Sequence, residues 1–392
     1  MSGEPAGTAG LAFTIPPPGR IEFGAGAVRR LPESLRTLGQ HRAFLVSDPG
    51  VRDAGLVDQV LATLASQGVE AAVFAEVEPN PTLDTVAEAA ALAREYGPAA
   101  VVALGGGSSM DAAKGVALLT CNGGDLAALD FGNSHSPAPP LVAIPTTAGT
   151  GAETNGFGVI ADPAARSKIY IGNPSLTPKV AILDPELTVG LPARATAATG
   201  TDALVHGVES LTSRGRNPVS ESYAHQAIRL VHRWLPIAVN DGANLEARAN
   251  LLLGAHLAGL ALTVSGLGLV HGIGHAVTAY TGAAHGVALA AVLEPVLRFN
   301  AEGGSAGCYA EIAFDLGVAD PGAPAAANAA AAIAELCRVP ERTGCYAPLR
   351  ALGCTEAQIP DLARTALADP VTANNPRLPS QTQLTNLIRA AL

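Results

Sequence analysis

The chain has 392 residues, of which 48% are hydrophobic and only 15% are charged. That length allows two domains of ~100 to 200 residues, each with its own core. The net charge is −10 and no basic run occurs, which argues against nucleic-acid binding. The 43 Gly and 29 Pro are spread along the chain, so a collagen-like, low-complexity or disordered protein is excluded.

Cysteine usage and the chain start bear on the cellular compartment. The five cysteines are odd in number and form no C-x-x-C pair, as expected for reduced thiols. Residues Met1 to Gly10 lack a basic region followed by an apolar run, so no secretory signal is expected. The longest apolar stretch, Leu251 to Val270, is interrupted by Gly, His, Thr and Ser, which favours a buried element over a membrane span. These features predict a soluble cytoplasmic protein without membrane partners.

Short β-rich runs alternate with helical patterns in the first half. This alternation is typical of βαβ units and a parallel sheet. Extended character returns around residues 170–184. Strands are predicted over residues 42–47, 71–77, 99–104 and 141–144, and helices over residues 83–96 and 110–118.

The second half is predicted to be almost entirely helical, because long Ala- and Leu-rich stretches replace the β-branched runs. Two prolines, Pro185 and Pro192, mark the change of texture. We therefore expect an α/β domain over residues 1–188 and an all-helical domain over residues 189–392. Helices are predicted over residues 195–213, 220–239, 245–263 and 325–337.

A glycine-rich turn, Gly105 to Ser109, lies between a buried strand and a helix. Glycines let the backbone approach a ligand, and amides at a helix start can donate to a phosphate. The alternative is an ordinary strand-to-helix turn capped by serine. The turn is not the G-x-G-x-x-G fingerprint, so a standard Rossmann assignment is not made.

Asp48 follows the first predicted strand. A carboxylate at this place can accept bonds from an adenosine ribose and repel a 2′-phosphate, which favours NAD over NADP. The alternative role is an N-cap before Pro49.

Seven of the nine histidines fall between residues 206 and 285. Asp202 and His206 are spaced i, i+4 on a predicted helix, His271 and His275 repeat that spacing, and His285 follows. Three imidazoles and a carboxylate suit Fe²⁺ or Zn²⁺. Spacing alone leaves open which four of the five residues bind.

Other candidate motifs are assigned no chemistry. His225, His232 and His256 have no comparable partners and are expected to be structural. The later cysteines share no segment with a catalytic base. The G-x-S-x-G match at Gly303 to Gly307 follows no β-rich run, so it is predicted to be a flexible loop and not a nucleophile elbow.

Taken together, these motifs resemble the iron-containing (group III) metal-dependent alcohol dehydrogenases, and the resemblance covers nearly the whole chain. The matching segments are Ile21 to Gly26, Pro79 to Thr82, Gly105 to Asp111, Ile144 to Thr150, Thr199 to His206, His271 to His275, His285 with Gly286, and Asn375 to Arg377.

The resemblance implies a dehydroquinate synthase-like fold with a dinucleotide-binding N-terminal domain, an all-helical C-terminal domain and an active site in the cleft between them. By resemblance, the metal ligands are Asp202, His206, His271 and His285, and His275 serves proton transfer. The implied cofactor contacts are Gly105, Gly106, Gly107, Ser108, Ser109 and Asp111 for phosphate and ribose, Thr146, Thr147 and Thr150 around the adenine and ribose, Lys168 near the nicotinamide ribose, and Asp48 as the residue that favours NAD.

One segment departs from the family. Many members carry Phe-x-Asn where this chain has Leu262-Thr-Val264. This segment and Phe157 are expected, by resemblance, to line the substrate pocket, so substrate size and polarity are left open.

The resemblance implies an NAD-dependent alcohol dehydrogenase or aldehyde reductase that uses Fe²⁺, with Zn²⁺ possible, acts on a small primary alcohol and its aldehyde, and forms a homodimer. One alternative keeps the reaction but gives an aldehyde carrying a carboxylate or phosphonate, with Arg166 or Lys168 as its partner. The other is a catalytically silent scaffold of the same fold.

Overall fold

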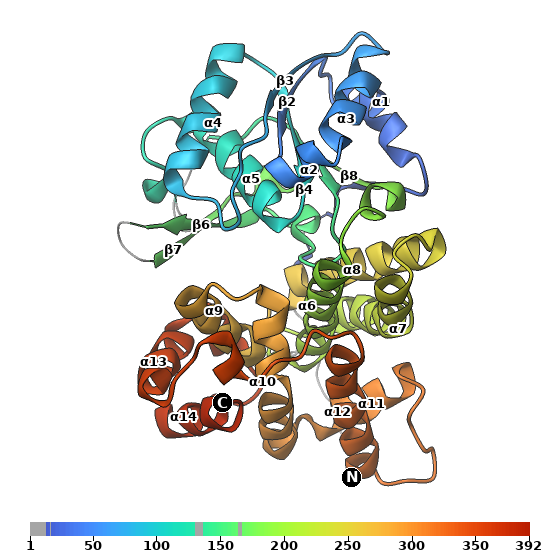
Figure 1. Ribbon diagram of the computed structural model, residues 1–392, viewed down its shortest axis with the longest axis vertical. Coiled ribbons are helices and arrows are strands. Elements are labelled where there is room, and N and C mark those ends of the chain that lie inside the picture. The colour runs from blue at the N-terminus through green and yellow to red at the C-terminus, as the bar shows by residue number, and fades with distance from the viewer. Residues whose placement is uncertain (1–12, 16, 130–135, 164–166) are drawn as a thin grey trace, which may run out of the picture.

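The computed structural model describes residues 13–15, 17–129, 136–163 and 167–392. Met1 to Gly10 and Arg166, which carry the predictions on a signal segment and on an acidic substrate, lie outside these ranges. A sheet domain and a helical domain are stacked along the long axis (Figure 1). The predicted boundary between residues 188 and 189 stays a prediction.

The N-terminal domain is built on a sheet of six strands in the described residues, in the order β1-β8-β5-β4-β2-β3, with all pairs parallel. Its central strands are buried throughout because helices cover both faces. An antiparallel hairpin of β6 and β7 stands apart from this sheet. The strands are β1 (Arg20–Phe23), β2 (Arg42–Val46), β3 (Glu70–Phe74), β4 (Ala100–Gly105), β5 (Leu141–Pro145), β6 (Phe157–Asp162), β7 (Ser167–Gly172) and β8 (Val180–Leu183).

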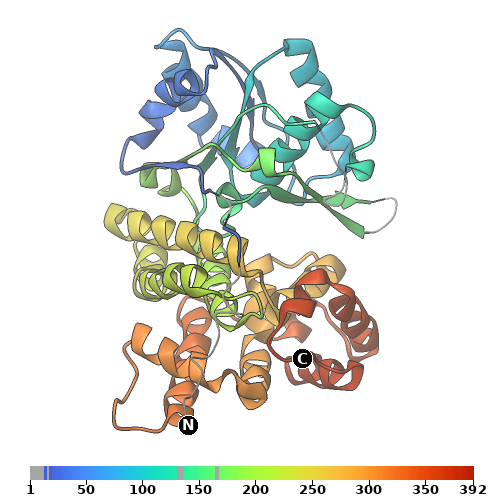
Figure 2. The same ribbon diagram turned by 180° about the vertical axis from the view of Figure 1, so that it is seen from behind.

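Alternate residues of each central strand enter different cores. On β4, Val101 and Ala103 pack with the helices α4 and α5, whereas Val102 and Leu104 pack with α1 and α3. Figures 1 and 2 show the two helical layers on opposite faces of the sheet. The helices of this domain are α1 (Leu31–Thr37), α2 (Pro49–Asp53), α3 (Leu56–Ala65), α4 (Leu83–Tyr96) and α5 (Gly107–Asn122).

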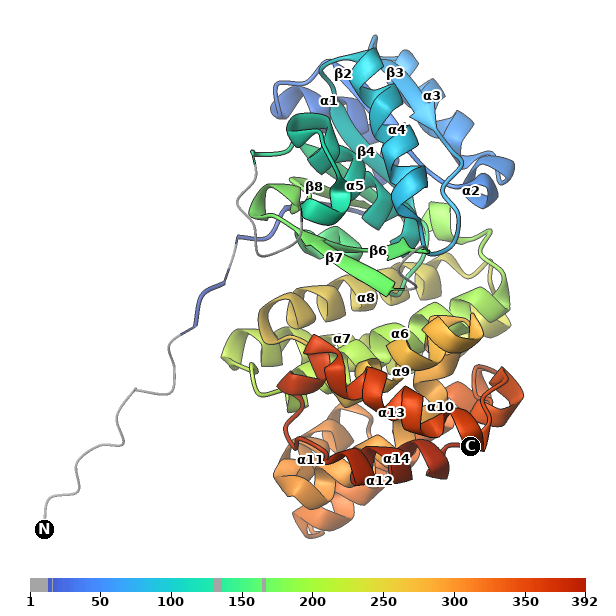
Figure 3. The ribbon, with the colours of Figure 1, turned by 90° about the vertical axis from the view of Figure 1, so that its left-hand side faces the viewer.

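The C-terminal domain is a bundle of helices around one large apolar core. In the described residues α8 alone is long and apolar enough to span a membrane, and 67% of its most apolar window is buried inside the protein. Figure 3 shows α8 lying directly below the β6–β7 hairpin. The helices are α6 (Ala193–Thr212), α7 (Pro218–Asn240), α8 (Leu245–Ser265), α9 (Leu269–Thr281), α10 (His285–Asn300), α11 (Ala306–Asp315), α12 (Ala325–Arg342), α13 (Ile359–Ala368) and α14 (Gln381–Ala390).

The G-x-S-x-G segment is not the loop that we predicted from sequence. Residues Ala301–Ser305 form a short π-helical segment, η7, that continues from α10, and α11 follows immediately. The left-handed backbone at Gly304 (φ 109°) makes the bend between the two helices. The second half of that prediction is confirmed, because no strand leads into the segment.

The two domains approach closely where α8 meets the segment after β5. A Cβ at Gly259 would lie 2.7 Å from the Cα atom of Gly151, so the backbones touch without side chains between them. The buried His256 Nδ1 lies 3.0 Å from a carboxylate oxygen of Glu153 across the same contact. His256 is thus structural, as expected, and it joins the domains.

Candidate functional site

Three histidine side chains from three helices converge on one buried carboxylate oxygen of Asp202. Asp202 and His206 lie one turn apart on α6, and Oδ1 of Asp202 is 3.3 Å from Nε2 of His206. The same oxygen is 3.3 Å from Nε2 of His271 on α9 and 3.7 Å from Nε2 of His285, the first residue of α10. The rings of His206 and His271 are stacked, with centroids 4.7 Å apart.

Close helix packing brings His285 to this point. A Cβ at the neighbouring Gly286 would lie 1.9 Å from the carbonyl oxygen of Ala198 on α6, so only glycine permits this approach. The His-Gly pair in the sequence therefore has a packing reason as well as a chemical one.

These distances fit a first-row divalent metal ion. Bonds of ~2.0–2.2 Å in a tetrahedral site place neighbouring donor atoms ~3.3–3.6 Å apart. Donor atoms of Asp202, His271 and His285 all lie within 4.8 Å of one another, and His206 reaches the same Asp202 oxygen. Three imidazole nitrogens and one carboxylate suit Fe²⁺ or Zn²⁺.

The electrostatics of the cluster favour a bound cation. Burial alone would raise the pKa of Asp202, but His206, with His271 and His285, holds it well below its ordinary range. Burial lowers the pKa of His206 to about 4 and that of His285 well below its ordinary value, so both rings are neutral and have a free lone pair. Asp202 and Glu209 outweigh burial at His271 and raise its pKa to about 9. Positive charge is therefore stabilised between the two carboxylates.

Glu209 contacts the metal-ligand candidate His271, and the sequence reasoning missed it. Its Oε2 lies 2.6 Å from Nδ1 of His271, and the carboxylate also accepts the backbone N–H groups of Gly268 and Val270 at the start of α9. The side chain is therefore fixed, and it holds His271 with Nε2 toward Asp202. Its position in the sequence could have indicated this contact, because Glu209 lies seven residues after Asp202 and three after His206, on the same face of α6.

His275 lies one turn beyond His271 and outside the four-donor cluster. Its ring stacks on that of His285 with centroids 5.3 Å apart, and its Nδ1 lies 2.8 Å from Oδ2 of Asp369. The other Asp369 oxygen accepts the N–H of Val371, which fixes the carboxylate. Because Nδ1–H of His275 donates to Asp369, Nε2 is the nitrogen that is left to accept or release a proton. Asp369 was also missed, because 94 residues separate it from His275.

A cavity of about 510 Å³ joins the donor cluster to the glycine-rich turn. It is lined by the four donors and His275 from the helical domain and by Gly107, Ser108, Asp111, Thr150 and Lys168 from the sheet domain. The site thus lies between the domains. Lys168 donates from Nζ to Oδ1 of Asn80, 3.2 Å away, and burial lowers its pKa.

The glycine-rich turn starts α5, and no side chain caps this end. A Cβ at Gly105 would meet the Ser109 hydroxyl oxygen at 2.4 Å, and one at Gly107 would meet a Thr150 methyl carbon at 2.7 Å. Because no side chain caps this end of α5, the N–H groups of its first turn can bind an anion, and the glycines leave room for the anion to approach. The helix begins at Gly107 and not at Met110 as predicted, because Gly106 serves as its N-cap.

Three further predicted contacts surround this turn. The N–H of Thr146 donates to the Gly105 carbonyl, and a Cβ at Gly106 would lie 3.2 Å from Thr147. Asp48 accepts both the Val51 N–H as N-cap of α2 and the Ser109 hydroxyl, at 3.0 and 2.7 Å. The N-cap alternative for Asp48 is thereby confirmed, and the carboxylate still lies beside the glycine-rich turn.

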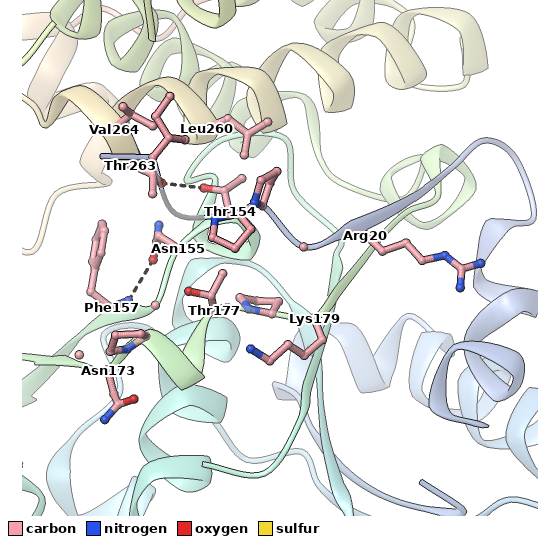
Figure 4. A pocket seen from close by; sticks show the side chains of 18 of the residues that line it. Arg20, Thr154, Asn155, Phe157, Asn173, Thr177, Lys179, Leu260, Thr263 and Val264 are labelled. Carbon is pink, nitrogen blue, oxygen red and sulfur yellow. Dashed lines mark hydrogen bonds between the residues drawn. The ribbon is translucent and has the colours of Figure 1, made fainter. Parts of the chain in front are cut away.

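The expected substrate-pocket residues are divided between two cavities. Phe157 and Leu262 line the cavity of the donor cluster, together with Thr263, which the sequence reasoning did not single out. Val264 lines an adjacent cavity, to which Phe157 and Thr263 also contribute (Figure 4).

Two further histidines and the cysteines have ordinary structural surroundings. His225 pairs with Asp315 and His232 with Glu335. All five cysteines are free, and burial raises the pKa of each thiol.

The chain is similar to known proteins along nearly its whole length. The family model for iron-containing alcohol dehydrogenases matches residues 18–185, and the C-terminal model of the Fe-containing alcohol dehydrogenase family matches residues 196–392. The NAD-dependent methanol dehydrogenase of Bacillus methanolicus is 36% identical, over 97% of this chain and 99% of its own.

Two solved structures are similar over the same extent. A crystal structure of 1,3-propanediol oxidoreductase has a TM-score of 0.94 at 36% identity and covers 97% of this chain and 100% of its own. Sulfoacetaldehyde reductase from Bifidobacterium kashiwanohense, in complex with NAD⁺, has a TM-score of 0.88 at 30% identity and covers 97% and 98%.

Proposed function

The chain belongs to the iron-containing alcohol dehydrogenase family, and we propose that it transfers a hydride between NAD(H) and a small primary alcohol or its aldehyde in the cleft between its domains. The observation that carries this proposal is the convergence of three imidazole nitrogens on Asp202 Oδ1, at 3.3 to 3.7 Å, in the cavity that the glycine-rich turn also lines.

Asp202, His206, His271 and His285 would hold the metal ion, and they are the four ligands that the family resemblance implies. A divalent ion bound there acts as a Lewis acid toward the alcohol or carbonyl oxygen. The donors come from three packed helices, and Glu209 fixes one of them, so the site is held in shape before metal or substrate binds.

The sheet domain would hold the cofactor. Free N–H groups at the start of α5 suit the pyrophosphate, and Asp48 beside them suits a ribose and disfavours a 2′-phosphate. Lys168 and Asp111 line the cavity on the way to the donor cluster, where the nicotinamide end belongs. Holding both reactants across the cleft places the reacting carbons together and excludes water.

His275 is the residue to which we assign proton transfer. Asp369 orients its ring, and the ring lies beside His285 at the edge of the donor cluster without contributing to the four donors. An imidazole placed there can accept the alcohol proton during oxidation and return it during reduction.

Neutral substrates are favoured over acidic ones. The methanol and propanediol enzymes among the relatives are named for neutral alcohols, whereas sulfoacetaldehyde reductase is named for an acidic aldehyde. In this chain Lys168 is already hydrogen-bonded to Asn80 and faces the carboxylates of Asp111 and Asp369.

We also propose that the protein is a cytoplasmic homodimer. Light scattering, which measures the molar mass in solution, tests the dimer.

The deciding experiment is a cofactor assay on protein purified without oxygen and supplied with Fe²⁺ or Zn²⁺. NADH should form with propan-1-ol and be consumed with propanal or lactaldehyde, and NADPH should serve poorly. A folded protein that binds neither metal and turns over none of these would instead be the silent scaffold. Faster turnover of carboxylated than of neutral aldehydes would overturn the substrate class alone.

A further inference from the structure

A second cavity of about 580 Å³ adjoins the catalytic cavity of about 510 Å³. The two share three lining residues, namely Asn155 and Phe157 from the sheet domain and Thr263 from α8. These residues therefore form a partition between the cavities. Figure 4 shows the second cavity with Phe157 and Asn155 at one side and the residues of α8 above them.

Neighbouring residues of α8 line different cavities, which shows where the partition lies. Leu262 lines only the catalytic cavity, and Leu260 and Val264 line only the second, while Thr263 between them lines both. The hydroxyl groups of Thr154 and Thr263, which both line the second cavity, lie 3.1 Å apart and link the sheet domain to α8. Of the three shared side chains, only Phe157 is large and apolar.

Lys114 fixes the chain segment that carries the ring. This lysine of α5 is fully buried, and its Nζ donates to the carbonyl oxygens of Ala152 and Phe157 and to Oδ1 of Asn155, at 2.7, 2.6 and 2.9 Å. All three ammonium hydrogens are thus used within residues 152–157. These bonds fix the backbone from which the Phe157 ring projects.

The second cavity has a mixed lining. Leu260, Val264, Pro17 and Pro178 are apolar, and Lys179, Asn173 and Thr177 are polar (Figure 4). Arg20 turns away from the cavity in Figure 4, and it forms an ion pair with Glu22. Leu260 and Val264 neighbour Thr263 of the partition on α8, and an unbranched alkyl chain suits this apolar side of the lining.

We infer that Phe157 sets the upper limit on alcohol chain length, because its ring closes the catalytic cavity against a second cavity able to hold an alkyl chain. This inference rests on the proposed function and names the substrate range of that site. Wild-type protein takes short alcohols, and removal of the ring connects the two spaces.

The test compares kcat/KM for propan-1-ol, butan-1-ol, hexan-1-ol and octan-1-ol with NAD⁺ in metal-loaded protein. In the wild type, kcat/KM should stop rising at an intermediate length. In Phe157→Ala it should continue to rise, by up to about fourfold for each methylene that enters the second cavity. The ratio of hexan-1-ol to propan-1-ol should increase at least about tenfold over wild type, with a smaller increase in Phe157→Leu.

Phe314→Ala is the matched control, because Phe314 lies on α11 and its side chain is 59% exposed. It should give the wild-type profile. Wild-type turnover with unchanged profiles in the folded Phe157 variants would overturn this inference alone, as would a wild-type profile that rises through octan-1-ol. If Phe157→Ala fails to fold, Phe157→Leu decides. A wild type that oxidises none of the alcohols would overturn the proposed function and the inference together.

Discussion

Carboxylates behind the histidines do much of the positioning in this site. Glu209 and Asp369 each hold one imidazole and are themselves held by backbone N–H groups. A ring fixed in this way presents one defined nitrogen to the cleft.

Glu209→Gln should weaken metal binding by about 10- to 100-fold, because the His271 ring loses its charged partner. Competition against a chelating dye measures this directly. Glu294→Gln, an exposed change on α10, is the control. Wild-type metal affinity in folded Glu209→Gln would contradict this role.

His275→Ala should lower kcat by about 10²- to 10⁴-fold while metal content stays at the wild-type level. Asp369→Asn should lower kcat less, because the imidazole remains but its orientation is lost. Combining the two should cost no more than His275→Ala alone, since both act through one ring. Metal loss in His275→Ala equal to that in a donor variant would contradict the division of labour.

At the scale of elements, the pair of His225 on α7 and Asp315 on α11 makes the stability of the fold depend on pH, independently of the active site. The hydrogen bond to Asp315 raises the pKa of His225 above its unfolded value. The folded state therefore binds more protons, and the stabilisation is complete below about pH 6.5 and disappears as pH rises through the folded pKa. Urea unfolding of wild type and His225→Gln should differ more near pH 6 than near pH 9. An equal difference at both pH values would show that the pair is not coupled to protonation.

Buried strands and long helices could be predicted from sequence. The strand over residues 141–144 and the helix over residues 83–96 agree closely with β5 and α4, because continuous apolar runs and clear caps mark them. β1 was missed because it is short and three of its four residues are exposed. The η7 segment was missed because its glycines suggested a loop, whereas its helical course follows from continuity with α10.

The candidate site was predictable only in part. The four donors and His275 follow from spacing together with the family resemblance, and the structure brings all five together. The partners Glu209 and Asp369 could not be paired with their histidines, because 62 and 94 residues separate them. The division of Phe157, Thr263 and Val264 between two cavities depends on how α8 packs against the sheet domain, which no local pattern encodes.

At the scale of the whole molecule, metal and cofactor are expected to bind to different domains. The donors lie on α6, α9 and α10, whereas the turn expected to hold the pyrophosphate belongs to α5. Protein stripped of metal by a chelator should therefore still bind NADH, seen as enhanced NADH fluorescence, while alcohol oxidation is lost and returns with Fe²⁺. Loss of NADH binding on chelation would show that the two half-sites depend on each other.

The backbone contact between Gly151 and Gly259 bears on how the cleft opens. The Glu153–His256 pair and the Thr154–Thr263 hydrogen bond tie the same two segments together beside this contact, so we expect any rotation of one domain against the other to turn about this point. We expect cofactor exchange to follow such a rotation, and turnover limited by it would slow as solvent viscosity rises.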